Sequence, residues 1–341
     1  MKKVLIGLGF CIVNLVGFSQ IPPGYYDSAA GKTGEDLREA LHLIIKGHTD
    51  ISYSSIKDTY HEVTDKKSNG QVWDMYSDVP GGAPSYTFTF IAGDKCGNYA
   101  KEGDCYNREH SFPQSWFSSA SPMQTDLFHV YPTDGYVNGR RASFPYGNVA
   151  SATWTSSNGG KLGTSATAGY SGTVFEPLDE YKGDFARTYF YMVTRYKDIA
   201  STFTSDMLTG DNLSGWAIDL MLDWSENDPV SQKETDRNNA VHDIQKNRNP
   251  YIDDISYVES VWGTPDGKAD LIGDFNFKYN NGLIQIENFN TDASELKIIS
   301  IVGTQIALYS IEGGQESIKV DLESGVYIAI IGGIGKRFVV K

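Results

Sequence analysis

The sequence changes its pattern near Trp262, and this change constrains the fold more than any other feature. Before it, residues 35–48 and 184–200 place apolar side chains at helical spacing. After it, the chain consists of short segments in which apolar and polar residues alternate. Roughly six such strands in the last ~70 residues favour a small β-sandwich. The sequence therefore predicts two domains, an α+β domain over residues 21–265 and an all-β domain over residues 271–341.

The N-terminus has the composition of a signal peptide. Lys2 and Lys3 precede an apolar run over residues 4–16, which is shorter than the ~20 residues that a membrane-spanning helix needs. We therefore expect residues 1–20 to be removed on export. The mature protein is expected to be secreted or cell-surface, with no transmembrane segment.

Local signals predict further elements. Residues 71–77 and 85–90 carry aromatic and β-branched residues, and a Pro/Gly-rich turn separates them; they predict two strands. Ser231 followed three residues later by Glu234 predicts a capping box at the start of a helix.

The segment over residues 107–117 concentrates chemistry. Arg108, Glu109 and His110 follow one another, and Pro113 lies just beyond. An imidazole takes up a proton near neutral pH, and a carboxylate is a hard ligand suited to Mg²⁺ or Ca²⁺. Neighbouring side chains of an extended segment point to opposite faces, so Glu109 and His110 serve one site only if the backbone bends there. The alternative is a surface turn with an Arg–Glu pair and a structural histidine.

A second segment makes this pattern specific. Residues 126–141 read D-L-F-H-V-Y-P-T-D-G-Y-V-N-G-R-R. Together with R-E-H-S-F-P-Q-S-W-F at residues 108–117, they resemble the bacterial endonuclease I family of secreted, non-specific nucleases. The resemblance extends over residues 31–263 and includes Q-K-N-R-N-P-Y-I-D, where Lys246 stands in place of the family's usual glycine. It implies a ββα-metal (His-Me finger) nuclease domain with added helices.

The resemblance also implies roles for individual residues. His110 would be the general base, and Glu109 and His129 would hold one divalent cation. Mg²⁺ is expected, with Ca²⁺ and Mn²⁺ as alternatives. Many relatives have asparagine in place of His129, whose imidazole is a softer ligand than an amide oxygen.

Other polar residues of these segments would support the same site. Arg141 would neutralise the scissile phosphate, and Asp126 would contact a metal ligand. The residues expected to bind substrate are Arg108, Arg140 and Asn138. For Asn138 the alternative role is to hold the loop or a metal-bound water. We expect hydrogen bonds that support the site from beneath, made by Gln245, Asn247, Arg248 and Asn249. Direct catalysis by these residues is the alternative. On helix 184–200, Arg187 and Arg195 are either functional or ordinary ion-paired charges.

Without the signal peptide, the chain keeps two cysteines, Cys96 and Cys105. In an oxidising exterior they are expected to form a disulfide that closes a short loop just before the catalytic segment. The alternative is a pair of free thiols.

The C-terminal segments S-G-V-Y-I-A-I and K-R-F-V-V-K resemble sorting domains of the type IX secretion system. This resemblance implies the type IX machinery as a partner; a binding or stalk module is the alternative.

The expected function is a secreted, metal-dependent endonuclease that hydrolyses DNA, with RNA as a further candidate substrate, through contacts to the phosphate backbone. A net charge of −14 argues against a protein that coats nucleic acid, whereas an enzyme needs only a local cationic cleft. The competing hypotheses are a secreted metal-dependent phosphoesterase acting on small substrates and a non-catalytic surface adhesin.

Overall fold

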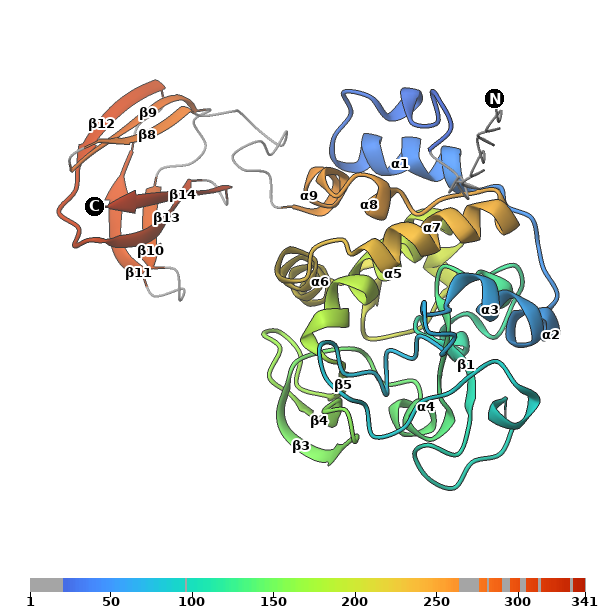
Figure 1. Ribbon diagram of the computed structural model, residues 1–341. Helices are drawn as coiled ribbons and strands as arrows, with labels where there is room; N and C mark the ends of the chain where they lie inside the picture. Colours follow the sequence, from blue (N-terminus) through green and yellow to red (C-terminus); the bar gives the residue numbers. More distant parts are fainter. Residues whose placement is uncertain are drawn as a thin grey trace, which may run out of the picture. The chain divides into compact units, whose positions relative to one another are not determined.

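The computed structural model describes residues 21–95, 97–263, 276–280, 282–289, 295–300, 305–311, 314–331 and 334–340. The chain divides into two compact units, one ending at Val261 and the other beginning at Trp262. Figure 1 shows helices and small sheets in the first unit and strands in the second. The fold is thus of mixed α+β type, with a β-rich C-terminal region.

The α-helices are α1 (Gly34–Ile45), α2 (Tyr53–Ser55), α3 (His61–Thr64), α4 (Gly135–Arg141), α5 (Lys182–Arg195), α6 (Gly215–Asn227), α7 (Gln232–Gln245), α8 (Pro250–Asp253) and α9 (Ser256–Trp262). A π-helical turn, η2 (Ile56–Tyr60), joins α2 to α3. The 3-10 turns are η1 (Asp27–Ala29), η3 (Ala92–Asp94), η4 (Gln114–Phe117), η5 (Met123–Thr125), η6 (Asp179–Tyr181) and η7 (Ala200–Thr202).

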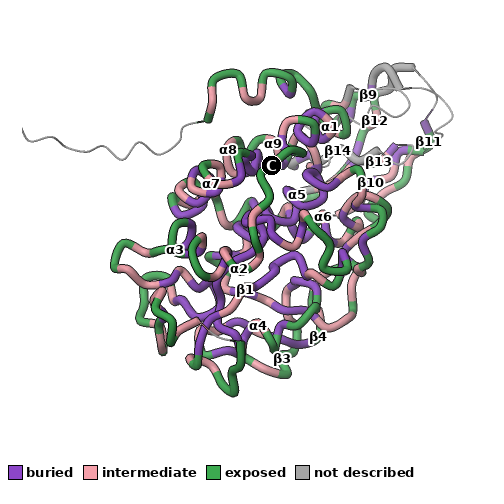
Figure 2. The backbone as a smooth tube through the Cα atoms, turned by 90° about the vertical axis from the view of Figure 1, so that its right-hand side faces the viewer, coloured by how far each residue is buried: buried purple, intermediate pink, exposed green. Residues whose placement is uncertain are grey.

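Helix α5 is the centre of the first unit. All of its residues except Lys182 are buried, and it packs against α1, α6 and α8. The buried tube of α5 is visible in Figure 2. A helix that is buried on every side must pair its charges internally. Arg187 does so, because its guanidinium meets Glu234 of α7 at 2.6 Å with both side chains buried.

The helix predictions are confirmed, with shifted ends. The pattern at residues 35–48 forms α1, and that at residues 184–200 forms α5, which begins earlier and ends at Arg195. The capping box at α7 is also confirmed, since the Ser231 side chain accepts from the Glu234 backbone and the Glu234 side chain accepts from the Ser231 backbone.

The two predicted strands at residues 71–77 and 85–90 are wrong. Only isolated bridges occur there, between Lys66 and Val72 and between Gln71 and Thr89. The buried carboxylate of Asp74 accepts hydrogen bonds from the Tyr76 backbone at 2.8 Å and the Ser77 hydroxyl at 2.7 Å. Such local bonds turn the chain and compete with a strand ladder.

A two-stranded antiparallel ribbon carries the segments with the predicted chemistry. Strand β1 (Tyr106–His110) pairs with β2 (Val130–Asp134), so that His110 lies opposite Val130 and Glu109 opposite Tyr131. Helix α4 follows β2 directly, and the Asp134 side chain caps it by accepting from the Val137 backbone. The other sheets of this unit are β3 (Val149–Thr155) with β4 (Lys161–Ser165) and β5 (Thr173–Glu176), and β6 (Leu208–Thr209) with β7 (Asn212–Leu213).

The second unit contains two antiparallel sheets. One has the order β11-β10-β13-β14 and the other β12-β9-β8. Their bounds are β8 (Asn276–Asn280), β9 (Leu283–Phe289), β10 (Glu295–Ser300), β11 (Gln305–Ser310), β12 (Gly314–Lys319), β13 (Gly325–Ile331) and β14 (Ile334–Val340). Apolar residues of both sheets, such as Ile286, Ile298 and Ala329, form one buried cluster. The alternating pattern therefore reflects strands with one buried face.

Among the described residues, none of the helices combines the length and hydrophobicity required to cross a membrane. The expected signal peptide at residues 1–20 lies outside the described residues.

The expected disulfide stays a prediction, because Cys96 lies outside the described residues while Cys105 is buried. Peptide mapping of exported protein should find the two cysteines linked, and removal of the link should lower stability by about 2–3 kcal/mol, because the loop is short. Recovery of both cysteines alkylated without prior reduction would refute the pairing.

His61 of α3 makes the first unit sensitive to acid. The residue is fully buried, and burial lowers its pKa from 6.5 to about 3. Since the unfolded chain binds the proton more readily, this contribution to stability is present above pH 6.5 and is lost as the pH falls towards 3. At pH 5 the loss is about 2 kcal/mol. His61→Leu should therefore lose about 2 kcal/mol less than the wild type between pH 7.5 and pH 5, measured by urea unfolding; an equal loss would contradict this account.

Candidate functional site

The β1–β2 ribbon presents different residues on its two sides. Asn107 and Glu109 face α4, where they meet Asn138 and Arg141. His110, whose side chain points the other way along the strand, lies against Tyr53. Adjacent Glu109 and His110 can therefore share a site only if the chain bends after them. Strand β1 ends at His110, so the chain leaves the extended conformation at this residue.

His110 is held as a neutral imidazole. Its side chain is buried, and its Nε2 lies 3.0 Å from the carbonyl oxygen of Gln124. A carbonyl only accepts, so Nε2 carries the proton and Nδ1 keeps the lone pair. Burial lowers the pKa of His110 to about 3. The residue therefore keeps an unprotonated nitrogen over the whole neutral range.

His129 lies beside it, with the two ring centroids 5.4 Å apart. Its Nε2 donates to the carbonyl oxygen of Met123 at 2.6 Å, and burial lowers its pKa. The Phe112 backbone also hydrogen-bonds weakly with the ring, and Nδ1 has no partner at full hydrogen-bond geometry. The Met123 carbonyl therefore fixes the orientation of the His129 ring.

Glu109 is buried on the opposite side of the strand. Its Oε1 accepts from the Tyr76 hydroxyl and from Arg141, each at 2.7 Å. Burial raises the pKa of Glu109, and the guanidinium of Arg141 opposes that shift. Both bonds go to Oε1, so Oε2 remains for another partner.

Arg141 is fully buried beneath the ribbon. Besides Glu109, it donates to the carbonyl oxygens of His110 at 3.0 Å and Ser111 at 2.6 Å, and its guanidinium lies 4.4 Å from the Tyr146 ring. This arrangement fixes the backbone at His110 and Ser111, where β1 ends.

The other predicted substrate-binding residues are spread around the ribbon. Arg108 stacks on Tyr53, with its guanidinium 3.8 Å from the ring centroid. Asn138 donates to Asn107 at 2.7 Å and to the Arg108 carbonyl at 3.3 Å, which fastens α4 to β1. Arg140 points away from this group and lies over Trp154, 5.3 Å from its ring.

Asp126 organises the backbone just before His129. Its carboxylate accepts hydrogen bonds from Tyr191, Tyr196 and Gln245 at 2.8–3.0 Å. Gln245 in turn accepts from the Leu127 backbone at 2.5 Å. The segment around His129 is thus fixed by hydrogen bonds from α5 and from the end of α7.

The remaining residues of the 245–249 segment have different partners. Asn247 donates to Tyr191 at 2.7 Å, in the same network as Asp126. Arg248 pairs with Asp253 at 2.6 Å, and Asn249 caps α8 through the Tyr251 backbone. The structure therefore brings Gln245 and Asn247 close to the ribbon, whereas Arg248 and Asn249 hold the α7–α8 connection.

Sequence reasoning missed Tyr53 and Tyr76. Tyr53 stacks over His110, with ring centroids 6.0 Å apart and an interplanar angle of 26°. No motif marks it, because it comes from a short helix some fifty residues earlier in the chain. Tyr76 lies in the segment that was predicted as a strand. In the sequence it is marked only as an aromatic residue close to Asp74, which does not indicate a contact with Glu109.

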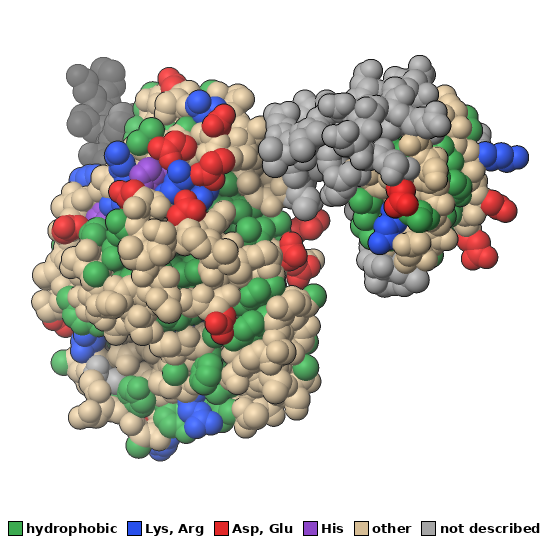
Figure 3. Space-filling view, turned by 180° about the vertical axis from the view of Figure 1, so that it is seen from behind, with side chains coloured by type: hydrophobic (Ala, Val, Ile, Leu, Met, Phe, Trp, Pro, Cys, Tyr) green, Lys and Arg blue, Asp and Glu red, His purple; other side chains and the backbone are tan. Residues whose placement is uncertain are grey.

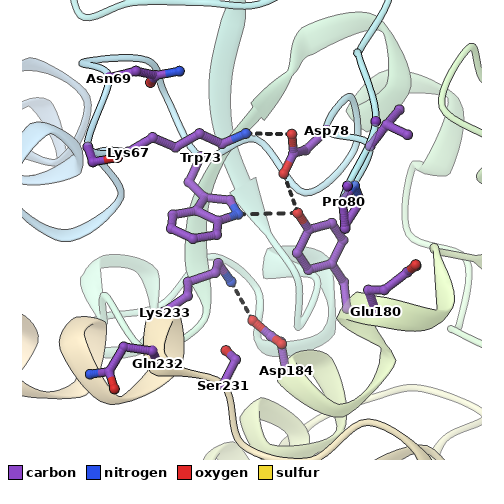
Figure 4. A pocket seen from close by; sticks show the side chains of 15 residues that line it. Lys67, Asn69, Trp73, Asp78, Pro80, Glu180, Asp184, Ser231, Gln232 and Lys233 are labelled. Atoms are coloured by element: carbon purple, nitrogen blue, oxygen red, sulfur yellow. Dashed lines mark hydrogen bonds and ion pairs between the residues drawn. The ribbon is translucent and has the colours of Figure 1, made fainter.

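Charged side chains also occur on the face shown in Figure 3 and in one described pocket of this unit. On the face shown in Figure 3, acidic and basic side chains are interspersed in one cluster and sparse elsewhere. A pocket of about 590 Å³ lies at the start of α7. Figure 4 shows that its lysines are already paired, Lys67 with Asp78 and Lys233 with Asp184.

The described residues contain no group of three or more His, Cys, Asp or Glu side chains that could hold a metal ion. Glu109 Oε2 lies on the α4 side of the ribbon, whereas His129 lies beside His110 on the other side. A carboxylate oxygen suits Mg²⁺ or Ca²⁺, and an imidazole is a softer ligand.

The ribbon thus gathers two neutral imidazoles, of His110 and His129, and the buried carboxylate of Glu109. Residues 33–256 match the family Endonuclease I. The chain belongs to the endonuclease I family and is a nucleic-acid hydrolase.

Curated relatives carry names that agree with this. The chain is 34% identical over 247 residues to the extracellular ribonuclease of Bacillus amyloliquefaciens, covering 70% of this chain and 78% of that protein. The extracellular ribonuclease of Bacillus subtilis (strain 168) is 32% identical over the same length. Endonuclease-1 of Buchnera aphidicola subsp. Baizongia pistaciae is 31% identical over 130 residues, 38% of this chain and 46% of that protein.

Proposed function

We propose that this protein is a secreted endonuclease that hydrolyses phosphodiester bonds of DNA and RNA with one divalent cation and His110 as general base. The observation that carries the proposal is the pair of neutral histidines at the ribbon. His110 and His129 each donate Nε2–H to a carbonyl, and each keeps Nδ1 as the lone-pair nitrogen.

In the proposed reaction, a water molecule attacks phosphorus and gives its proton to Nδ1 of His110. The Gln124 carbonyl, 3.0 Å from Nε2, orients the ring and stabilises the imidazolium that forms. Tyr53 covers the ring and limits its rotation. The guanidinium of Arg108 lies over the same Tyr53 ring, where it is placed to meet a phosphate near the base.

Glu109 and His129 would hold the cation, which supplies charge neutralisation at the phosphoryl and leaving oxygens. Arg141 acts beneath them, because it holds the Glu109 carboxylate and the backbone of the bend together. In this proposal β1, β2 and α4 form the ββα-metal motif. Mg²⁺ is the expected ion, with Ca²⁺ and Mn²⁺ as alternatives.

The same comparisons support the proposed substrate and location of the enzyme. Relatives named as extracellular ribonucleases and as endonucleases support nucleic acid as the substrate, read through its backbone and not its bases. They also support export, for which residues 1–20 would be the signal peptide. The all-β region at residues 271–341 would be the type IX sorting domain, removed or used for attachment after export.

The test is incubation of the full chain with plasmid DNA, RNA or a small phosphodiester, each with Mg²⁺, Ca²⁺, Mn²⁺ or EDTA. The proposal expects cleavage of both polymers with metal and none with EDTA. Cleavage of the small phosphodiester alone would favour a phosphoesterase. Binding without any cleavage would favour the adhesin.

A further inference from the structure

Three aromatic side chains from separate segments line the outer side of α4. The Tyr99 and Tyr136 ring centroids are 6.4 Å apart, and those of Tyr136 and Trp154 are 6.3 Å apart. Arg140 lies over Trp154 at 5.3 Å. We name these four residues the aromatic strip. Figures 1 and 2 both place α4 and β3, which carries Trp154, at the same end of the first unit.

Two glycines of α4 allow the strip to form. A Cβ at Gly135 would lie 2.5 Å from Cδ1 of Tyr99, and a Cβ at Gly139 would lie 2.5 Å from its hydroxyl oxygen. The two positions are four residues apart and so share one face of the helix. Each glycine in a helix costs ~1 kcal/mol relative to alanine. The two glycines therefore make this short helix less stable than alanine would, but they leave room for the Tyr99 ring against it.

The strip is accessible and carries a cation that has no acidic partner. Tyr99 is 37% exposed, and Arg140 is exposed. Within the part of the chain that the structure describes, Arg140 makes no ion pair. The acidic neighbours in the Tyr99 loop already accept from backbone N–H groups, Glu102 from Ser157 and Asp104 from Ala100 and Lys101.

The strip is joined to the proposed site through α4 itself. The inner side of the helix contacts β1 through Asn138, and Arg141 holds Glu109 and the His110 backbone. A helix is about 10 Å across with its side chains. A polymer bound at the ribbon therefore reaches the strip within a few residues of its own length.

We propose that the aromatic strip binds unpaired bases of a single-stranded nucleic acid whose scissile phosphate lies at the ribbon, an inference that rests on the proposed function. Half-exposed rings stack with any base, because every base has a π face. Arg140 adds a positive charge for a phosphate and a planar group for stacking. The strip reads no sequence, as expected for a non-specific nuclease.

The geometry favours a single strand over a duplex. In a duplex the bases are already stacked on one another and cannot lie on protein rings, whereas splayed bases of single strands can. The strip should therefore distinguish strandedness and not base identity.

The experiment measures binding in the His110→Ala background of the full chain with Mg²⁺, so that substrate is not consumed. A labelled single-stranded oligonucleotide and its duplex are titrated against Trp154→Ala, Tyr99→Ala and Arg140→Gln. Loss of a stacked base costs about 1–3 kcal/mol, so each aromatic variant should raise Kd for the single strand by about 5- to 150-fold. Kd for the duplex should stay unchanged.

The control is Trp216→Ala. Trp216 is also half-buried and stacks on another tyrosine, Tyr170, with centroids 4.4 Å apart, but it lies outside the strip. It should bind both oligonucleotides like the parent. Thermal unfolding of each variant confirms that the fold is kept.

Two results would overturn the inference. Aromatic variants that bind the single strand like the parent would remove the strip from recognition. An equal loss with the duplex would remove the preference for single strands. Cleavage assays with the wild-type protein, on a dinucleotide and on the polymers, separate the two proposals. If neither the dinucleotide nor the polymers are cleaved, the proposed function itself is wrong.

Discussion

Replacing His110 with alanine is expected to lower the rate of nucleic-acid cleavage by about 10²–10⁴-fold, the usual loss when a general base is removed. The reason is the neutral ring with its proton fixed on Nε2 by Gln124, which leaves Nδ1 as the nitrogen that accepts the proton of water. Metal affinity should be nearly unchanged, because in the proposed mechanism the base contacts water and not the ion. Initial rates on plasmid and RNA, measured at saturating Mg²⁺, give the effect.

The matched control is His242→Ala, which removes a histidine from α7 of the same unit. It should cleave like the wild type. Melting temperatures of both variants must be close to that of the wild type for the comparison to hold. A His110→Ala protein that stays folded and cleaves at the wild-type rate would remove His110 from catalysis.

Replacing Arg187 with methionine is expected to destabilise the first unit by about 3–5 kcal/mol, because it leaves a buried carboxylate without its partner. The guanidinium donates to both oxygens of Glu234, at 2.6 and 2.7 Å, and to the Asp228 carbonyl at 2.8 Å. The effect is measured as the change in the free energy of unfolding in urea.

Arg195→Met is the control, since Arg195 lies on the same helix and contacts the His48 ring instead of a carboxylate. It should cost much less. Adding Glu234→Gln to Arg187→Met should restore part of the loss, because glutamine is neutral and can still complete the capping box with Ser231. Equal losses for Arg187→Met and Arg195→Met would show that the buried pair contributes nothing special.

Local signals predicted the elements whose structure is decided locally. The helical pattern of α5 and the capping box at Ser231 depend on residues within a few positions of one another, so the sequence alone contained them. Residues 71–77 failed for the opposite reason. There the buried carboxylate of Asp74 also accepts from the distant Asp134 backbone at 2.9 Å, and this tertiary contact overrides the alternating pattern.

The candidate site shows the same division. The motifs marked Glu109, His110 and His129, and the ribbon brings the two histidines together. The motifs could not reveal which side of β1 each residue faces, nor that Arg141 would be buried against Glu109. Tyr53 left no trace at all, because its role depends only on where α2 packs.

In the proposed mechanism the base and the metal ligand are different histidines, so metal affinity and cleavage should respond differently to their loss. Mg²⁺ affinity and cleavage are determined together for His110→Ala, His129→Ala and His129→Asn. The account predicts wild-type affinity without cleavage for the first, and weakened affinity with cleavage partly restored by excess metal for the second. It predicts the mildest loss for His129→Asn, which keeps a ligand atom and restores the residue common among relatives. If His129→Asn were as inactive as His110→Ala while its metal affinity stayed unchanged, His129 would not be a ligand and the account would be wrong.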